Sequence, residues 1–419
     1  MSTKHVMAAV WLLAVGTPTT WAQEDPDHCA PILEVATCLS GFDEHGGRFI
    51  FVVPRSWNGD LVIYSKPSQG FVSGERANRQ FIAFRDAVVG EGYAVGYLDQ
   101  PYRDYKTDAQ QTYRLPQRLA RLAGEPRSVY LVGESRGGVF SLDLVETYPQ
   151  RFAGALVQCA PALGFADSTK WRLDVRVLFD YFFTLGRVVD AGIPRILETP
   201  LDSTSADYAG RILGLLAEPD GPANVDRIAR VMRFPDFPPF IRGGNPSPLE
   251  PDLCTTAPAA EASWVVSPIL FLMNQDRDFL AEIPVRSPYD NASTVYTDPE
   301  NPEADAALNA GVERFRGSRP AMNHQAKYYT PTGDLRRPVL LLYNRFDPLG
   351  VLGSNQRYGE LVASRASGEF LATWSVDRAS HCWFTQAERI EAFHALVRWV
   401  NGGEKPISGD APVPGRSCP

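Results

Sequence analysis

A serine within residues 129–138 has the surroundings that a catalytic nucleophile needs. The stretch reads Val-Tyr-Leu-Val-Gly-Glu-Ser-Arg-Gly-Gly, so an apolar run leads into Gly133-x-Ser135-x-Gly137, and a segment of helical character without proline follows. We expect a strand, a sharp turn and a helix, with Ser135 at the turn and small residues where the two backbones crowd. The backbone N–H of Arg136 would then face the oxygen that becomes negative during acyl transfer.

Two further residues have the types and positions that would activate this serine. A serine hydroxyl attacks near neutral pH only when a histidine accepts its proton and an acid orients that histidine. We expect His381 to be the base, because it follows a predicted strand and precedes the last helix, whereas His394 lies inside that helix and is interpreted as solvated surface. Asp347 is the favoured acid, because it follows the strand 338–343 and precedes His381 by one helix and one strand.

A second stretch resembles the strand before Asp347 and provides an alternative acid. Residues 268–274 repeat the pattern of residues 338–344, in which a proline opens an apolar run that ends in asparagine. Asp276 and Asp278 follow that stretch closely. Either stretch could be the strand that presents the acid, so Asp276 or Asp278 remains the alternative to Asp347.

The elements around these residues predict a mostly parallel sheet with helices on both faces. Strands are expected at 48–54, 61–65, 93–98, 128–132, 153–157, 338–343 and 370–376, and helices at 77–91, 107–123, 138–148, 355–365 and 386–401. Short buried strands that alternate with helices are typical of the α/β class, whose sites lie at the carboxyl ends of the strands. We expect Pro116 to kink or break the helix 107–123.

A long segment interrupts this pattern. Residues 162–335 contain helix-like runs at 171–189, 208–216 and 225–231, proline-rich loops and little β periodicity. We interpret this segment as a large inserted, mainly helical cap over the open end of the sheet. The catalytic core would then comprise residues 23–161 and 336–419.

The amino-terminal residues and the overall charge restrict where the protein works and what it binds. Residues 1–22 have the composition of a secretory signal peptide, and their apolar run is too short to span a bilayer, so we expect a secreted or periplasmic protein without stable membrane insertion. The 419-residue chain carries a net charge of -8, which disfavours nucleic acid as a partner. No C-x-x-C or His/Cys cluster has metal-ligand spacing, so we expect neither a metal nor an organic cofactor.

The chain resembles α/β-hydrolase fold enzymes over about residues 48–161 and 336–402, and their catalytic residues follow the same order of Ser, Asp and His. Its ending from His381 to Thr385, His-Cys-Trp-Phe-Thr, is similar to the close of secreted tannase and feruloyl-esterase-like enzymes. The resemblance implies a large sheet domain with an inserted cap and hydrolysis through an acyl-enzyme.

The resemblance also bears on the cysteines, of which the chain has six, enough for three disulfides and 15 pairings. In the tannase-like enzymes a cysteine after the histidine pairs with one beside the serine. Glu134 stands beside the serine here, so the resemblance implies Cys159 as the partner of Cys382. Pairing of Cys418 with Cys29 or Cys38 is the other pairing that we consider.

The predicted function is therefore the hydrolysis of small-molecule or polymeric carboxylic esters by a serine hydrolase. An exported serine aminopeptidase or amidase of the same fold is the alternative, with Glu198, Asp220 or Asp236 as the acidic group for the amino terminus of its substrate. A non-catalytic binding module of this fold is the alternative from another class, although a fold alone does not determine function. The sequence carries no signal of an oligomeric state.

Several residues are expected to contact substrate. Many α/β-hydrolases carry His-Gly where this chain has Lys66-Pro67, and proline has no N–H, so the second oxyanion donor is expected at Ser68 or Gln69. The candidate substrate-binding side chains are Lys66, Tyr102, Tyr181 and Phe182. For the last two, packing of the cap onto the core is the other interpretation. Asn291-Ala292-Ser293 is an N-glycosylation sequon.

Overall fold

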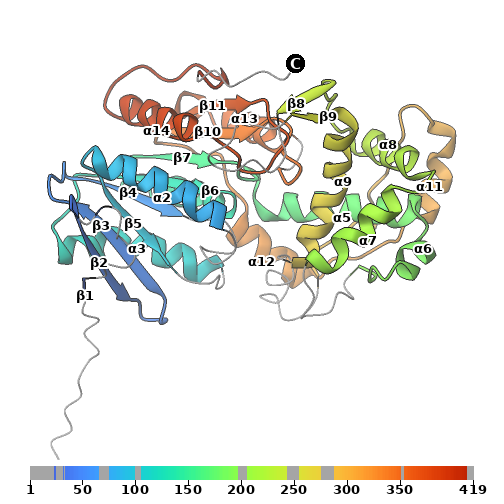
Figure 1. Ribbon diagram of the computed structural model, residues 1–419, viewed down its shortest axis with the longest axis horizontal. Helices are drawn as coiled ribbons and strands as arrows, with labels where there is room; N and C mark the ends of the chain where they lie inside the picture. Colours follow the sequence, from blue (N-terminus) through green and yellow to red (C-terminus); the bar gives the residue numbers. More distant parts are fainter. Residues whose placement is uncertain are drawn as a thin grey trace, which may run out of the picture.

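A ten-stranded sheet forms the centre of the computed structural model, which describes residues 23–24, 32, 34–65, 75–99, 105–196, 205–242, 254–274, 287–350 and 353–412 (Figure 1). The strands are β1 (Gln23–Glu24), β2 (Ala36–Phe42), β3 (Arg48–Pro54), β4 (Asp60–Ser65), β5 (Ala94–Leu98), β6 (Ser128–Glu134), β7 (Gly154–Gln158), β10 (Val339–Asn344), β11 (Leu371–Val376) and β12 (Gly409–Asp410). Their spatial order is β1-β2-β3-β5-β4-β6-β7-β10-β11-β12. The pairs from β1 to β5 are antiparallel and all later pairs are parallel.

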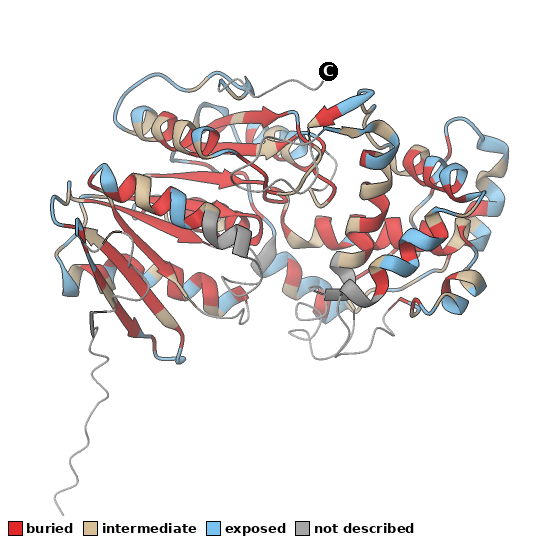
Figure 2. Cartoon of the chain, in the orientation of Figure 1, coloured by how far each residue is buried: buried red, intermediate tan, exposed pale blue. Residues whose placement is uncertain are grey.

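Helices cover both faces of this sheet, as the sequence predicts. On one face lie α2 (Glu75–Gly90) and α14 (Gln386–Val400), which share an apolar core with the strands. On the other face lie α3 (Tyr105–Leu122), α4 (Arg136–Thr147) and α13 (Ser354–Ser364). The short 3-10 helix η4 (Gly368–Phe370) follows α13 in the chain. The central strands are consequently buried on both sides (Figure 2). Such a three-layer arrangement explains why these strands are almost continuously apolar.

The sequence predicts a kink or a break at Pro116, and the break is wrong, because α3 continues through this residue. Proline disfavours a helix interior by removing one backbone hydrogen bond. Here, however, Leu115 and Leu119 are fully buried against the sheet, with Pro116 on the same side. Burial of this face stabilises the helix by more than the proline costs, which is the usual way in which tertiary packing overrides a local preference.

Between β7 and β10 the chain forms a second, mainly helical body, which we call the helical segment. It comprises α5 (Gly164–Phe182), α6 (Leu185–Asp190), α7 (Ser205–Leu216), α8 (Gly221–Met232), α9 (Ala257–Asn274), η3 (Pro302–Ala304), α11 (Asp305–Gly311) and α12 (Arg319–Tyr329), with the hairpin β8 (Phe240–Arg242) and β9 (Cys254–Thr256). It has an apolar core of its own. In Figure 1 it lies beside the ends of the sheet strands.

The stretch that resembles the strand before Asp347 is helical. Residues 268–274 form the second half of α9, and Trp264, Val265 and Ile269 of the same helix are buried in the core of the helical segment. A short apolar run cannot by its periodicity distinguish a strand from a helix that is buried on several sides. The prediction of a possible strand at 268–274 is therefore wrong, and Asp276 and Asp278, which follow it, lie outside the described residues.

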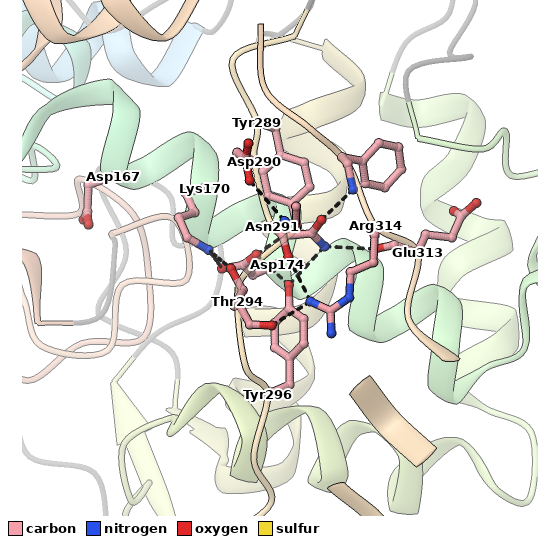
Figure 3. A network of polar contacts seen from close by, with 12 residues as sticks. Asp167, Lys170, Asp174, Tyr289, Asp290, Asn291, Thr294, Tyr296, Glu313 and Arg314 are labelled. Carbon is pink, nitrogen blue, oxygen red and sulfur yellow. Dashed lines mark hydrogen bonds and ion pairs between the residues drawn. The ribbon is translucent and has the colours of Figure 1, made fainter. Parts of the chain in front are cut away.

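Residues 287–301 have no regular structure, and a buried polar network attaches them to α5 (Figure 3). The hydroxyls of Tyr289 and Tyr296 both donate to Asp174, at 2.8 and 2.9 Å, and Lys170 donates to the other carboxylate oxygen at 2.6 Å. Burial and the Asp174 carboxylate raise the pKa of both tyrosines, so that both remain donors. The network gives this irregular segment one defined position.

The sequon asparagine belongs to this network. Asn291 is fully buried; its side-chain amide donates to the Glu313 carbonyl at 2.9 Å, and its side-chain oxygen accepts from the Phe315 N–H at 2.7 Å. A glycan at this nitrogen would replace the first bond and would need space that the fold has filled. The sequon is therefore not a glycosylation site of the folded chain.

One partly buried carboxyl on α4 predicts a pH-dependent stability. Burial raises the pKa of Asp143, which accepts a hydrogen bond from Tyr105, from an ordinary 3.8 to about 6. Because the pKa is higher in the folded chain, the free energy of unfolding falls as pH rises from about 4 to 6. Asp143→Asn should therefore raise the free energy of unfolding by about 1–2 kcal/mol at pH 7.5 and by little at pH 4. Urea unfolding at both pH values tests this, and equal shifts at both would contradict it.

The described part of the chain contains no helix that is both long and apolar enough to cross a membrane. The predicted signal peptide, residues 1–22, lies outside the described residues.

Candidate active site

Ser135 lies at the junction of β6 and α4, where the backbone turns sharply. Its φ of 54° and ψ of -119° place it in a region that residues other than glycine rarely adopt. A Cβ on Gly133 would collide with the Gly137 carbonyl, and one on Gly138 would lie 2.7 Å from Ala160 Cβ. The small residues thus allow the strand, the turn and the helix to approach closely, and the Ser135 N–H is held by the Gln158 carbonyl at 2.8 Å.

The structure brings the three sequence-predicted catalytic residues together from loops after three strands. Ser135 Oγ lies 2.9 Å from His381 Nε2, and His381 Nδ1 lies 2.8 and 3.0 Å from the two carboxylate oxygens of Asp347. Asp347 Oδ1 also accepts the N–H groups of Leu349 and Gly350, at 2.8 and 2.9 Å. A neutral imidazole protonated at Nδ1 would donate to Asp347 and accept the serine proton at Nε2, which is the arrangement of a general base.

Three features together decide the fold. The sheet is parallel from β5 to β12, with β4 between β5 and β6, and the serine occupies a strained strand-to-helix turn at its carboxyl edge. The residues around that turn follow the chain order Ser135, Asp347 and His381. The chain has the α/β-hydrolase fold. This nucleophile turn is characteristic of the α/β-hydrolases, in which the residue after the serine contributes an oxyanion donor.

Comparison with known proteins relates the chain to solved structures of low sequence identity. No family model and no curated protein matches the sequence. Feruloyl esterase B from Aspergillus oryzae is 16% identical with a TM-score of 0.46, over 88% of this chain and 81% of that chain. Tannin acyl hydrolase from Aspergillus niger is 12% identical with a TM-score of 0.43, over 88% and 79%. A Pyrococcus furiosus esterase is 12% identical with a TM-score of 0.41, over 90% and 92%.

A disulfide joins the histidine loop to the sheet. Cys159, which follows β7, is bonded to Cys382, which follows His381, across a sequence separation of 223 residues. This is the pairing that the resemblance to tannase-like enzymes implies. Cys38 and Cys254 each take part in a disulfide as well. Cys29 and Cys418 lie outside the described residues.

The predicted oxyanion and substrate-binding residues are described only in part. Arg136 opens α4, so its backbone N–H lies at the positive end of the helix, while its side chain packs over the Phe140 ring at 4.6 Å. Ser68, Gln69, Lys66 and Tyr102 lie outside the described residues. Tyr181 and Phe182 pack against each other, with ring centroids 5.1 Å apart, and against the core of the helical segment.

Two cavities adjoin the candidate catalytic residues His381 and Asp347. One of about 360 Å³ is lined by His381, by the residues that follow Asp347, and by Thr255, Ser263 and Ser267 of β9 and α9. Another of about 310 Å³ lies behind Asp347, against Asn344 and Trp264. Tyr181 and Phe182 line neither of them. The wall that faces His381 therefore comes from α9, a stretch whose second half the sequence interpretation treated as a possible strand.

Sequence reasoning also missed the role of Arg389. This residue lies on α14 at helical spacing from Ala392, Phe393 and Leu396, all of which are buried. An arginine that replaces an apolar residue on such a face is the signal that could have identified it, because a buried arginine needs a buried partner. Its partner is Glu134, the residue before the nucleophile.

Proposed function

We propose that this chain is a serine hydrolase that cleaves carboxylic esters. Ser135 Oγ attacks the ester carbonyl while His381 Nε2 takes its proton, and Asp347 holds the resulting imidazolium. His381 then returns the proton to the alcohol oxygen as the C–O bond breaks, which leaves an acyl-Ser135 and the free alcohol. Water, deprotonated by His381, hydrolyses the acyl-enzyme. The observation that carries the proposal is the continuous hydrogen-bonded chain from Ser135 through His381 to Asp347.

Two backbone N–H groups would stabilise the negative oxygen of the tetrahedral intermediate. Arg136 would provide one, because it directly follows Ser135 and its N–H opens α4. Ser68 or Gln69, in the loop after β4, would provide the other. Both parts follow the arrangement of other α/β-hydrolases, in which one donor follows the serine and one follows an earlier strand.

We propose that the cavity beside His381 receives the alcohol part of the ester. His381 has to protonate the departing alcohol oxygen, so that group must lie next to the imidazole. The cavity is lined by the imidazole and mainly by small and hydroxyl side chains, among them Ser263 and Ser267. This lining suits an uncharged alcohol that carries hydroxyl groups. The helical segment, which supplies α9, would thus act as the cap of the enzyme.

Export to an oxidising compartment is part of the proposal. The four described cysteines are all disulfide-bonded, and such bonds persist mainly in exported proteins. Residues 1–22 would be removed as a signal peptide. Mass spectrometry of the protein recovered from a bacterial periplasm or culture medium tests this, and an intact amino terminus in the active form would contradict it.

Labelling with a fluorophosphonate tests the proposed chemistry. The reagent phosphonylates an activated serine and displaces fluoride, and peptide mapping locates the adduct. We expect the adduct on Ser135, together with turnover of aryl and alkyl esters. A folded protein that forms no adduct and hydrolyses no ester would contradict the proposal.

Enlarging one α9 side chain should change the preference for the alcohol. Ser263→Leu would fill part of the cavity beside His381, so kcat/KM should fall roughly 10-fold more for esters of bulky alcohols than for the methyl ester of the same acid. Ala262→Leu is the matched control, because it adds the same side chain at the neighbouring position, outside the cavity lining. A changed preference for the acyl chain, with the alcohol preference unaltered, would assign the cavity to the acyl group instead.

A further inference from the structure

A fully buried guanidinium lies beneath the candidate active site, between the nucleophile strand and the histidine loop. Arg389 and Glu134 are both almost completely buried. The two terminal nitrogens of Arg389 donate to the two carboxylate oxygens of Glu134, at 3.1 and 3.2 Å. The same nitrogens donate to Gln158 Oε1 at 2.8 Å and to the Cys382 carbonyl at 3.1 Å. A further bond, to Gln80 Oε1 of α2 at 3.0 Å, means that this side chain contacts four separate stretches of the chain.

Three of these partners of Arg389 adjoin residues of the catalytic constellation, whereas Gln80 lies on α2. Glu134 immediately precedes Ser135, and Cys382 immediately follows His381. The Gln158 backbone carbonyl accepts the Ser135 N–H at 2.8 Å. Arg389 is therefore bonded on both sides of the 2.9 Å hydrogen bond between Ser135 and His381.

The opposite charges of Arg389 and Glu134 stabilise each other. Burial alone would raise the pKa of Glu134, but the adjacent Arg389 and the hydrogen bond donated by Tyr64 hold that pKa below its usual value. Burial and the same carboxylate raise the pKa of Tyr64 far above its ordinary value, so its hydroxyl remains a donor. A planar guanidinium can satisfy several acceptors in fixed directions, which a lysine ammonium cannot do in the same way.

The Cys159–Cys382 disulfide spans the same gap covalently. It joins the residue after Gln158 to the residue after His381, so the bond and the guanidinium contact adjacent positions on the same two stretches. We propose that Arg389 is a positioning residue that, together with this disulfide, sets the separation of Ser135 and His381. The inference rests on the proposed function, because it concerns the geometry of that nucleophile and base.

The decisive experiment removes both charges of the pair. Glu134→Gln with Arg389→Met eliminates the ion pair without leaving an unpaired buried charge, and such replacements are often nearly neutral for stability. We expect a folded protein in which kcat for an aryl ester is roughly 10- to 100-fold lower while KM changes less than about twofold. An unchanged kcat in the folded double variant would overturn the proposal, because it would show that the pair has only a structural role.

A second buried ion pair provides the matched control. Arg176 and Asp180 on α5 are equally buried and 2.9 Å apart, and they lie within the helical segment. Arg176→Met with Asp180→Asn should change the urea midpoint by a similar amount and leave kcat unchanged. An equal loss of kcat in this control would attribute the first result to general loosening of the fold, and would likewise overturn the proposal.

Arg389→Lys decides the question if the double variant does not fold. Lysine keeps the charge beside Glu134, but its single nitrogen cannot reproduce the hydrogen bonds that the two terminal nitrogens of the guanidinium donate. We therefore expect kcat to fall about 5- to 10-fold with KM retained. A wild-type kcat in this variant would overturn the proposal. Failure of the proposed function is distinguishable, because it would appear as a wild-type protein that neither reacts with fluorophosphonate nor hydrolyses esters.

The shared role with the disulfide is tested by combining the changes. Cys159→Ala with Cys382→Ala removes one connection, and Arg389→Lys weakens the other. We expect the combined loss of kcat to exceed the product of the two separate losses, because each connection compensates for the other. A combined loss equal to that product would show independent roles and would overturn the claim that both set one separation.

Discussion

Replacing Ser135 by alanine is expected to lower kcat for ester hydrolysis by roughly 10⁴- to 10⁶-fold. The reason is that the variant lacks the Ser135 Oγ, which among the described residues is the hydrogen-bond partner of His381 Nε2, at 2.9 Å. Oxyanion stabilisation and substrate binding would remain and would account for the residual rate. The measurement is the initial rate with an aryl ester at saturating concentration, beside fluorophosphonate labelling of the same preparation.

A serine on the same strand serves as the control for this variant. Ser128 begins β6, at the end away from the turn, so Ser128→Ala should retain the wild-type rate and the label. If Ser135→Ala kept more than about 1% of the activity, or was labelled as fast as the wild type, another nucleophile would have to be sought.

Asp347→Asn should lower kcat by roughly 10³- to 10⁴-fold without unfolding the protein. Asp347 Oδ1 accepts two backbone N–H groups, so an asparagine would place its carbonyl oxygen there and its NH₂ towards His381 Nδ1. The imidazole would then have to accept at Nδ1 and carry its proton on Nε2, where it cannot take the proton of Ser135. The measurement is kcat together with the rate of fluorophosphonate inactivation, and both should fall in parallel.

Asp377 provides the control for that substitution. It follows β11 at the start of the loop that carries His381, is about half exposed, and pairs with Arg345 at 2.7 Å. Asp377→Asn should leave kcat unchanged. An Asp347→Asn enzyme with nearly full activity would show that another group orients His381, whereas a selective loss of folding would show a structural role for Asp347.

Local sequence patterns were sufficient to predict most elements of the sheet domain. The stretch before Ser135 has an apolar run that leads into Gly133, and it forms β6, which continues to Glu134. The helix 77–91 carries Phe81, Phe84 and Val88 at helical spacing, and these side chains are buried against the sheet in α2. Both predictions succeeded because the preference of the local sequence and the burial of its apolar side agree in these elements.

The sequence predictions were wrong where contacts with distant parts of the chain bury residues that their local sequence does not mark as buried. α9 is enclosed by α5, α7 and α8, and its described apolar side chains, such as Val265, Val266 and Ile269, are buried on several sides, so the sequence of this helix shows no helical stripe. Pro116 remains inside α3 because its helix face is buried. The local sequence around the sequon gives no sign that Asn291 is fully buried, because its contacts are with residues more than 20 positions later. These outcomes depend on neighbours that are distant in sequence.

The sequence by itself determined the fold class, the nucleophile turn and the order of the candidate catalytic residues, because these depend on periodicity and on glycine and serine at short range. Only the tertiary structure decided which acid meets His381, since β10 and β11 pair in the sheet while residues 268–274 form a helix. It also decided the contact of Arg389 with Glu134, which are 255 positions apart. Such contacts arise from the packing of α14 onto the strands. The periodicity of one element shows which of its faces is buried, but not which residues of another element pack against that face.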